Sequence, residues 1–357
     1  MPLPDPLQEA YATMWYGYPG GRAFDGLKVL IHSIRAVDVQ RSIVLLTLAD
    51  TPADAAAASA STANGEPNPL RMLAHAYPRV HLLPTPFYTI FHNRNVTCKA
   101  SLRRSCGGGG NGKRYLYMYS KFALWGMTQW SRIFYVDADA LVLNPLDYLW
   151  SNVTLGKNIV VAASYTIRVG KRAEPLCGRG WAQYNAGVML IRPAAAVMRA
   201  VLELLAVATD SHASPCRSDQ TFFSAWFAGR HTRCMPHSFN CRDPRLQQQD
   251  TEEAATLSRC LDDHKGRRAR SMPHVMHFAC GSMPNASAAT DRNATVYARA
   301  WALHLERSNE HIASEMARAG GAAKLVAAER GVVLEHYNPW KPICYSMSRR
   351  AQSMLQC

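Results

Sequence analysis

The chain has 357 residues, 48% hydrophobic and 18% charged, so it can bury a sizeable core and is not a disordered polypeptide. Its 40 Lys and Arg outnumber its 26 Asp and Glu, and the net charge of +14 favours anionic partners: nucleotide phosphates, acidic glycans, nucleic acid or a membrane surface. The basic residues are scattered, and the densest runs, 264–270 and 349–350, lack the interleaved aromatic residues of a nucleic-acid platform. We therefore expect no nucleic-acid partner.

The first part of the chain alternates between strand and helix patterns. We predict a strand at Tyr11–Tyr16, a helix over residues 27–34 from the spacing of Leu and Ile, and a buried strand at Ser42–Leu48. Asp50–Pro69 is rich in Ala, Ser, Thr and Pro, which predicts an exposed loop. Arg79–Leu83 is predicted to be a third strand. This order is typical of a parallel sheet that binds ligands at the carboxyl ends of its strands.

A segment rich in glycine follows at Cys98–Lys113. It contains two cysteines and the run Gly107–Gly110, but it has neither the strand before nor the Lys-Ser/Thr and helix start after that a phosphate-binding loop needs. We expect a loop tied by a disulfide.

The stretch at residues 134–150 is largely apolar but has two acids in its middle. Ile133–Val136 predicts a buried strand, and it ends abruptly at Asp137 and Asp139. In an extended chain, positions i and i+2 project to the same side, so both carboxylates can face one point, which the small Ala138 leaves uncrowded. A hard divalent cation that carries a phosphate-bearing substrate would balance their charge. The alternative is a strand-end turn whose acids accept backbone N–H groups.

The other patterns predict further elements of one domain, with no linker between two autonomous units. They are a helix at Ser120–Gln129, strands at Asn158–Ala163, Ala186–Ile191 and His274–Phe278, and helices at residues 197–208, Ser218–Ala228 and Tyr297–Arg318. Between them, His231–Pro273 is long, polar and contains cysteines.

Cysteines and glycosylation sequons favour an oxidising compartment. The ten cysteines are dispersed and include no CxxC pair, which argues against zinc-ribbon and thioredoxin-type sites. Asn95, Asn152, Asn285 and Asn293 each begin an N-glycosylation sequon. Met1 is followed by neither a signal peptide nor an apolar run of about 18 residues. Either a membrane anchor lies upstream of this sequence, or the protein is cytoplasmic with reduced thiols; we favour the anchor and a secretory location.

Three later segments each begin or end a predicted element. They are Tyr184-Asn185-Ala186-Gly187-Val188-Met189, Ser218-Asp219-Gln220, and His277-Phe278 followed by Gly281 and Pro284. With the acidic strand, and with Lys121 just before it, this ordered set resembles the glycogenin-like retaining glycosyltransferases, glycosyltransferase family 8. The resemblance covers roughly residues 10–284, with inserted loops.

The resemblance implies a single GT-A domain of the α/β class, with a Rossmann-like mixed sheet flanked by helices. Its nucleotide half would cover about residues 1–145 and its acceptor half about 146–345, followed by a tail at 346–357. It also implies Mn²⁺, a UDP-sugar donor and retention of configuration. Within the secretory pathway that the cysteines and sequons favour, we expect a location in the Golgi lumen. The acceptor would be a hydroxyl of a polysaccharide, glycoprotein, glycolipid or polyol.

The resemblance also implies a role for each matching residue. Asp139 and His277 would be direct Mn²⁺ ligands, with Asp137 between the metal and the ribose or sugar of the donor. A mixed carboxylate and imidazole set suits Mn²⁺ better than Mg²⁺. The residues expected near the reacting sugar are Lys121, Asn185, Asp219 and Gln220, with Lys121 close to the diphosphate. Those expected along the nucleotide and sugar ring are Met14, Tyr16, Asp137, Ala138, Ala186, Gly187 and Gly281. Core packing is the alternative for Met14 and Tyr16, and helix capping for Asp219.

The last motif departs from the family pattern. Where the family has HFxGxxKPW, this chain has HFACGSMPN, with Cys280, Met283 and Asn285 in place of Gly, Lys and Trp. The missing lysine puts a phosphate contact in doubt, and Lys341 is a hypothetical replacement. Besides a transferase, the sequence leaves open a catalytically weak UDP-sugar or glycan-binding protein. A glycoside hydrolase is the third alternative, and it would need its two carboxylates on either side of a glycosidic bond.

Overall fold

The computed structural model describes residues 8–15, 22–49, 68–86, 118–153, 155, 161–165, 184–207, 219–220, 223, 232–242, 273–278, 284, 286–290 and 296–319. The predictions for Tyr16, Cys98–Lys113, Gly281 and Lys341, and for the motif departures Cys280, Met283 and Asn285, lie outside these residues. No helix in the described part of the chain is long and apolar enough to cross a bilayer.

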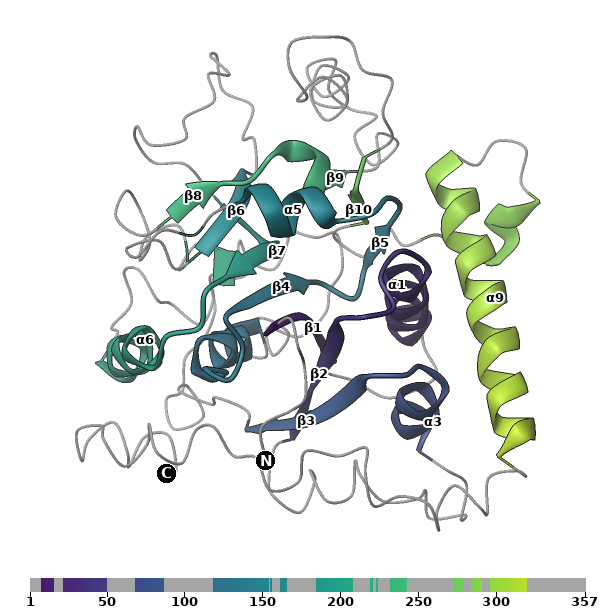
Figure 1. The fold of residues 1–357 in the computed structure, drawn as a ribbon, viewed down its shortest axis with the longest axis horizontal. Coiled ribbons are helices and arrows are strands. Elements are labelled where there is room, and N and C mark those ends of the chain that lie inside the picture. Colours follow the sequence, from purple (N-terminus) through teal and green to yellow (C-terminus); the bar gives the residue numbers. More distant parts are fainter. Residues whose placement is uncertain are drawn as a thin grey trace, which may run out of the picture.

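A mixed seven-stranded sheet forms the centre of the described residues (Figure 1). Its order is β3-β2-β1-β4-β7-β6-β8. The strands are β1 (Glu9–Trp15), β2 (Ser42–Ala49), β3 (Val80–Pro86), β4 (Arg132–Val136), β6 (Val161–Tyr165), β7 (Tyr184–Ile191) and β8 (Thr232–Cys234). Strands β3, β2, β1 and β4 are parallel, whereas β7 runs antiparallel to both β4 and β6. The predicted α/β class and mixed sheet are confirmed.

Alternation along the strands builds a core on each face of the sheet. In β4, Ile133 and Tyr135 face one core while Phe134 and Val136 face the other, as the two-residue period of a strand requires. One face packs against α1 (Arg22–Val37), α3 (Pro69–Ala76) and α5 (Asp147–Asn152). The other packs against the 3₁₀ helix η2 (Tyr119–Gly126) and α6 (Ala195–Val207).

A second, three-stranded sheet stands beside the first. Its order is β5-β10-β9, formed by β5 (Ala140–Val142), β10 (Val275–His277) and β9 (Cys241–Arg242). Strand β10 is antiparallel to β5 and parallel to β9. The long helix α9 (Val296–Arg318) packs on α1 and α3, and residues of its first half join a third core cluster with β5, β9 and β10 (Figure 1). The short 3₁₀ helices η3 (His237–Phe239) and η6 (Ala286–Ala289) complete the described elements.

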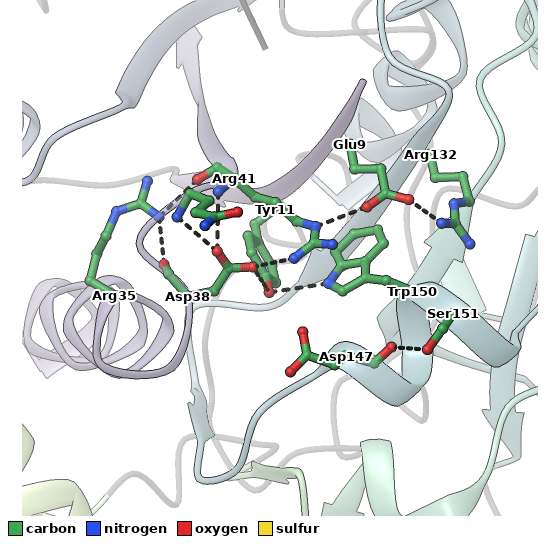
Figure 2. Close-up of polar contacts among 10 residues, drawn as sticks. Glu9, Tyr11, Arg35, Asp38, Arg41, Arg132, Asp147, Trp150 and Ser151 are labelled. Atoms are coloured by element: carbon green, nitrogen blue, oxygen red, sulfur yellow. Dashed lines mark hydrogen bonds and ion pairs between the residues drawn. The ribbon is translucent and has the colours of Figure 1, made fainter. Parts of the chain in front are cut away.

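The amino-terminal edge of the parallel strands is fastened by an ionic network (Figure 2). Glu9, at the start of β1, pairs with Arg132 of β4 and at 2.9 Å with Arg41, which also pairs with Asp38 at 2.7 Å. Both guanidinium groups lie over the ring of Trp150 in α5. The network therefore joins two strands to the end of α1 and to α5.

Several elements differ from the sequence prediction. The predicted helix at Ser120–Gln129 is the 3₁₀ helix η2, which ends at Gly126. Of the predicted loop at Asp50–Pro69, residues 50–67 lie outside the described part of the chain, and the last residue, Pro69, begins α3. Strands β8 and β9 lie within the polar stretch His231–Pro273, for which we predicted no strand.

Candidate functional site

The candidate site lies at the carboxyl ends of β1 and β4. The strand order reverses at this point: β2 and β3 lie on one side of β1, and β4, which follows them in the sequence, pairs with its other side. The sheets of α/β proteins bind ligands at such points. The antiparallel β7 brings its first residues to the same edge, where the backbone N–H of Asp137 donates to the Gly187 carbonyl at 2.7 Å. The site therefore takes residues from β4, β7 and the start of β5.

Three predicted metal ligands come together at this edge. One ligand atom from each of Asp137, Asp139 and His277 lies within 4.8 Å of the other two. Nε2 of His277 is 3.1 Å from Oδ1 of Asp139. The small sheet creates this proximity, because His277 pairs with Ala140 across β10 and β5, and the Phe278 N–H donates to the Asp139 carbonyl at 2.8 Å.

The cluster fits a divalent cation. Two carboxylates and one imidazole supply the mixed oxygen and nitrogen donors that suit Mn²⁺. The His277 side chain is buried, while those of Asp137 and Asp139 are partly exposed, so a substrate can approach from the side of the acids.

Gly187 lies against this cluster. A Cβ built on it would lie 2.4 Å from Cε1 of His277, 2.8 Å from Oδ2 of Asp137 and 3.0 Å from Oδ1 of Asn185. Carbon atoms do not approach other groups this closely, so the cluster needs a residue without a side chain here. Gly187 leaves room for His277 and Asp137 in the structure, and its expected place beside the sugar ring stays a prediction.

Lys121 of η2 is fully buried and holds two carboxylates. Its Nζ is 2.9 Å from Asp137 and 2.9 Å from Asp219, and it donates to the Ala186 carbonyl at 3.2 Å. These three acceptors match the three N–H groups of an ammonium. Burial alone would lower the pKa of Lys121, but the charges of Asp137 and Asp219 outweigh it and raise that pKa above its ordinary value, so the side chain stays charged.

Two further residues contact the predicted site residues, and sequence reasoning missed both. The Tyr135 hydroxyl donates to Oδ1 of Asp137, and the Tyr135 ring lies 5.1 Å from Nζ of Lys121. Oδ1 of Asn240 is 3.1 Å from Nδ1 of His277. Strand alternation could have indicated Tyr135, which is two residues before Asp137; no sequence signal pointed to Asn240.

The remaining predicted residues are near the cluster or in the core. The side-chain oxygen of Asn185 accepts the Gly187 N–H at 2.8 Å. Gln220 follows Asp219 and is half-buried, and Ala138 packs partly against a core cluster. Met14 is buried in the core near the end of β1, which agrees with core packing, the alternative given for it. The functional roles of all these residues stay predictions.

Comparisons with known proteins agree with this site. Residues 111–283 match the model of the family described as Glycosyl transferase family 8. A sequence comparison with curated proteins found no significant match. Among solved structures, the chain is similar to the apo-form glycosyltransferase GlyE of Streptococcus pneumoniae TIGR4. The TM-score is 0.50 and the identity 14%, over 87% of this chain and 64% of that chain.

Two other solved structures are more distant by TM-score. One is the galactosyltransferase LgtC in complex with donor and acceptor sugar analogs, with a TM-score of 0.44 and 17% identity over 86% of this chain and 95% of that chain. The other is mouse xyloside xylosyltransferase 1, with a TM-score of 0.45 and 12% identity over 77% of this chain and 98% of that chain.

The fold is therefore that of a GT-A glycosyltransferase, in a single α/β domain. The segment that matches the family model contains Lys121, the acidic strand, Asp219 and His277. The match to glycosyl transferase family 8 thus covers residues 111–283 of the chain. The chain spans 64% of the length of the GlyE structure.

Proposed function

We propose that the protein transfers a sugar from a UDP-sugar to an acceptor hydroxyl, with Mn²⁺ as cofactor and with retention of configuration. The observation that carries this proposal is the cluster of Asp137, Asp139 and His277 at the carboxyl edge of β4. The family match and the basic net charge of the chain support it.

Asp137, Asp139 and His277 would hold the cation beside the diphosphate of the donor. When bound, Mn²⁺ orients the diphosphate and stabilises the charge that develops on leaving UDP. His277 is fixed by the small sheet and Asp137 by its bonds to Lys121 and Tyr135, so the ligands are positioned before the donor arrives.

Lys121 orients two carboxylates of the site. Its ammonium bridges Asp137, which we propose as a ligand of the cation, and Asp219, which we expect to bind sugar hydroxyls, so the two are held at a fixed separation. Because Asp219 is held in this buried ion pair, it suits binding of sugar hydroxyls better than attack on the anomeric carbon. We therefore propose front-face attack, in which an oxygen of the departing phosphate accepts the proton of the acceptor hydroxyl.

The proposed location is the lumen of the secretory pathway, in the Golgi. Cys241 of β9 is disulfide-bonded, and Asn152, which begins a sequon, is exposed at the end of α5. Both features suit an oxidising, glycosylating compartment. The alternative is a cytoplasmic protein.

A screen of UDP-sugars for UDP release tests the activity without knowledge of the acceptor. We expect release with at least one donor in Mn²⁺ and loss of release in EDTA. Asp139→Asn and His277→Gln should each lower the rate about 100-fold or more, because they remove a ligand rather than its support. Asp147→Asn is the matched control, since this exposed acid of α5 lies outside the cluster. Equal rates in EDTA would refute the proposal.

The departure at Met283 favours a second candidate, a protein that binds UDP-sugars and turns them over weakly. Calorimetry with UDP distinguishes the two: binding that needs Asp139, without release of UDP from any donor, would support the weak binder.

Identification of the product anomer by NMR would decide whether the configuration of the transferred sugar is retained.

A further inference from the structure

We propose that Asn240 is a positioning residue of the metal site: it holds His277 in the tautomer whose Nε2 is free of hydrogen and faces the two acids. This inference rests on the proposed function, because it assumes that the cluster binds a divalent cation.

The two ring nitrogens of His277 face different partners. Nδ1 lies 3.1 Å from Oδ1 of Asn240, and Nε2 lies 3.1 Å from Oδ1 of Asp139. His277 is 4% exposed and Asn240 9% exposed, so exchange of these partners for water is restricted. The ring therefore spans the space between an amide and the acidic strand.

The chemistry of the amide oxygen selects the tautomer. A neutral imidazole has one N–H donor and one acceptor nitrogen, and a carboxamide oxygen only accepts. Nδ1 must therefore carry the hydrogen to bond with Asn240, which leaves the lone pair of Nε2 directed at the acids, as a metal ligand requires. In the opposite tautomer, the Nε2–H would donate to Asp139 and would occupy the direction in which a cation binds.

The backbone around Asn240 is held independently of the cluster. Asn240 lies between η3 and β9, and β9 pairs in parallel with β10, so that Cys241 is opposite Met276. The His274 N–H donates to the Ser238 carbonyl at 2.7 Å, and the rings of Phe239 and His274 stack at 4.5 Å. Asp139 precedes β5 beside the carboxyl end of β10, whereas Asn240 precedes β9 on the other side of β10, beside its first residues.

Three variants separate the oxygen acceptor from the packing of the side chain. Asn240→Leu keeps the approximate shape and removes the acceptor, whereas Asn240→Asp keeps an acceptor oxygen. Asn144→Leu is the control, because the Asn144 amide makes a comparable bond to the Pro273 carbonyl at 2.9 Å beside the same small sheet.

The first measurement is Mn²⁺ affinity by calorimetry, without nucleotide. We expect Asn240→Leu to bind Mn²⁺ about 10- to 100-fold more weakly, and Asn240→Asp to bind within about threefold of wild type or more tightly. Asn144→Leu should not change the affinity. Unchanged binding in Asn240→Leu, or equal weakening in the Leu and Asp variants, would overturn the proposal.

The second measurement is the tautomer of His277 in the metal-free protein, from ¹⁵N chemical shifts, with the His277→Gln variant to identify its signals. We expect Nδ1–H in wild type and a shift towards Nε2–H in Asn240→Leu. A wild-type Nε2–H tautomer would overturn the role of Asn240 even if Mn²⁺ binds. A wild-type protein that binds no Mn²⁺ would overturn the metal site itself, and this inference with it.

Discussion

Gly187 has no side chain, and the geometry of the cluster of Asp137, Asp139 and His277 depends on that absence. Gly187→Ala would place a methyl group 2.4 Å from the His277 ring and 2.8 Å from Asp137. We expect Mn²⁺ affinity to fall at least about tenfold, with a loss of about 1–3 kcal/mol in the free energy of unfolding from overpacking. Calorimetry and urea unfolding measure the two effects.

The effect of Gly187→Ala should act through His277. In a His277→Gln background, which already lacks the imidazole, the alanine should therefore weaken the remaining Mn²⁺ binding by less than in the wild-type background. Additive losses would show that the methyl group acts elsewhere.

At the residue scale, the sequence predicted which side chains would meet but not what supports them. Asp137 and Asp139 follow from their spacing, but His277 was found through resemblance, since 138 residues separate it from Asp139. Asn240 lies in a polar stretch without periodicity, so its contact with His277 depends on the pairing of β9 with β10. Such pairing is a property of the fold and leaves no local signal.

At the scale of elements, the network around Glu9 links the starts of β1 and β4. Burial alone would raise the pKa of Asp38, but hydrogen bonds from Arg41 and Tyr11 outweigh it and lower that pKa. The Trp150 indole N–H in turn donates to the Tyr11 hydroxyl at 3.3 Å (Figure 2). The network should contribute more to stability than a surface ion pair does.

Glu9→Ala tests this contribution. It leaves Arg41 and Arg132 without the carboxylate between them, and we expect it to lower the free energy of unfolding by about 2 kcal/mol, between the values for exposed and buried pairs. Asp25→Ala is the control, because the pair of Asp25 with Lys28 on α1 is more exposed and should contribute less than about 1 kcal/mol. Equal losses in urea unfolding would contradict the role of the network.

The elements that the sequence predicted poorly are short ones. Asn68 caps α3 by accepting the Leu70 N–H, and Pro69 takes the first helical position, so the signal was present but hidden by the Ala- and Ser-rich stretch before it. Segment η2 is buried along its whole length and ends at Gly126, where Met127 bonds back to Leu124 with 3₁₀ spacing. Tertiary packing determines the conformation of such a buried segment more than the intrinsic helix propensity of its residues does.

At the scale of the whole molecule, the layered α/β arrangement was predictable because buried strands alternate with amphipathic helices over long stretches. Strands β8 and β9 were not predictable, because they have only three and two residues, too few to show a pattern. They form through pairing with β6 and β10. The domain boundaries near residues 145 and 345 stay predictions.

The packing of α9 on the body of the domain includes a histidine group. Nδ1 of His32 lies 3.1 Å from the Tyr77 hydroxyl, and that hydroxyl donates to Ser308 of α9 at 2.8 Å. The rings of His32 and His304 are 5.3 Å apart. Burial, together with nearby His304, His311 and Arg307, lowers the pKa of His32 from 6.5 to about 4.

This shift predicts that acid weakens the domain. The folded protein keeps His32 neutral while the unfolded chain protonates it, so the stabilisation is complete above about pH 6.5 and is lost as the pH falls towards 4. The loss should be below about 1.4 kcal/mol per pH unit, because the ring is only half-buried. Urea unfolding at pH 7 and pH 5 measures it. His32→Asn should reduce the pH dependence, and an unchanged dependence would contradict the assignment.

The separation between Asp139 and His277 also has a consequence for biosynthesis. A ribosome adds about 5 to 20 residues per second, so the two acids emerge roughly 7 to 28 seconds before the imidazole that completes their cluster. Nascent chains that stop within this interval have the acids alone. Under the proposed function, only finished molecules would therefore have all three ligands of the cation.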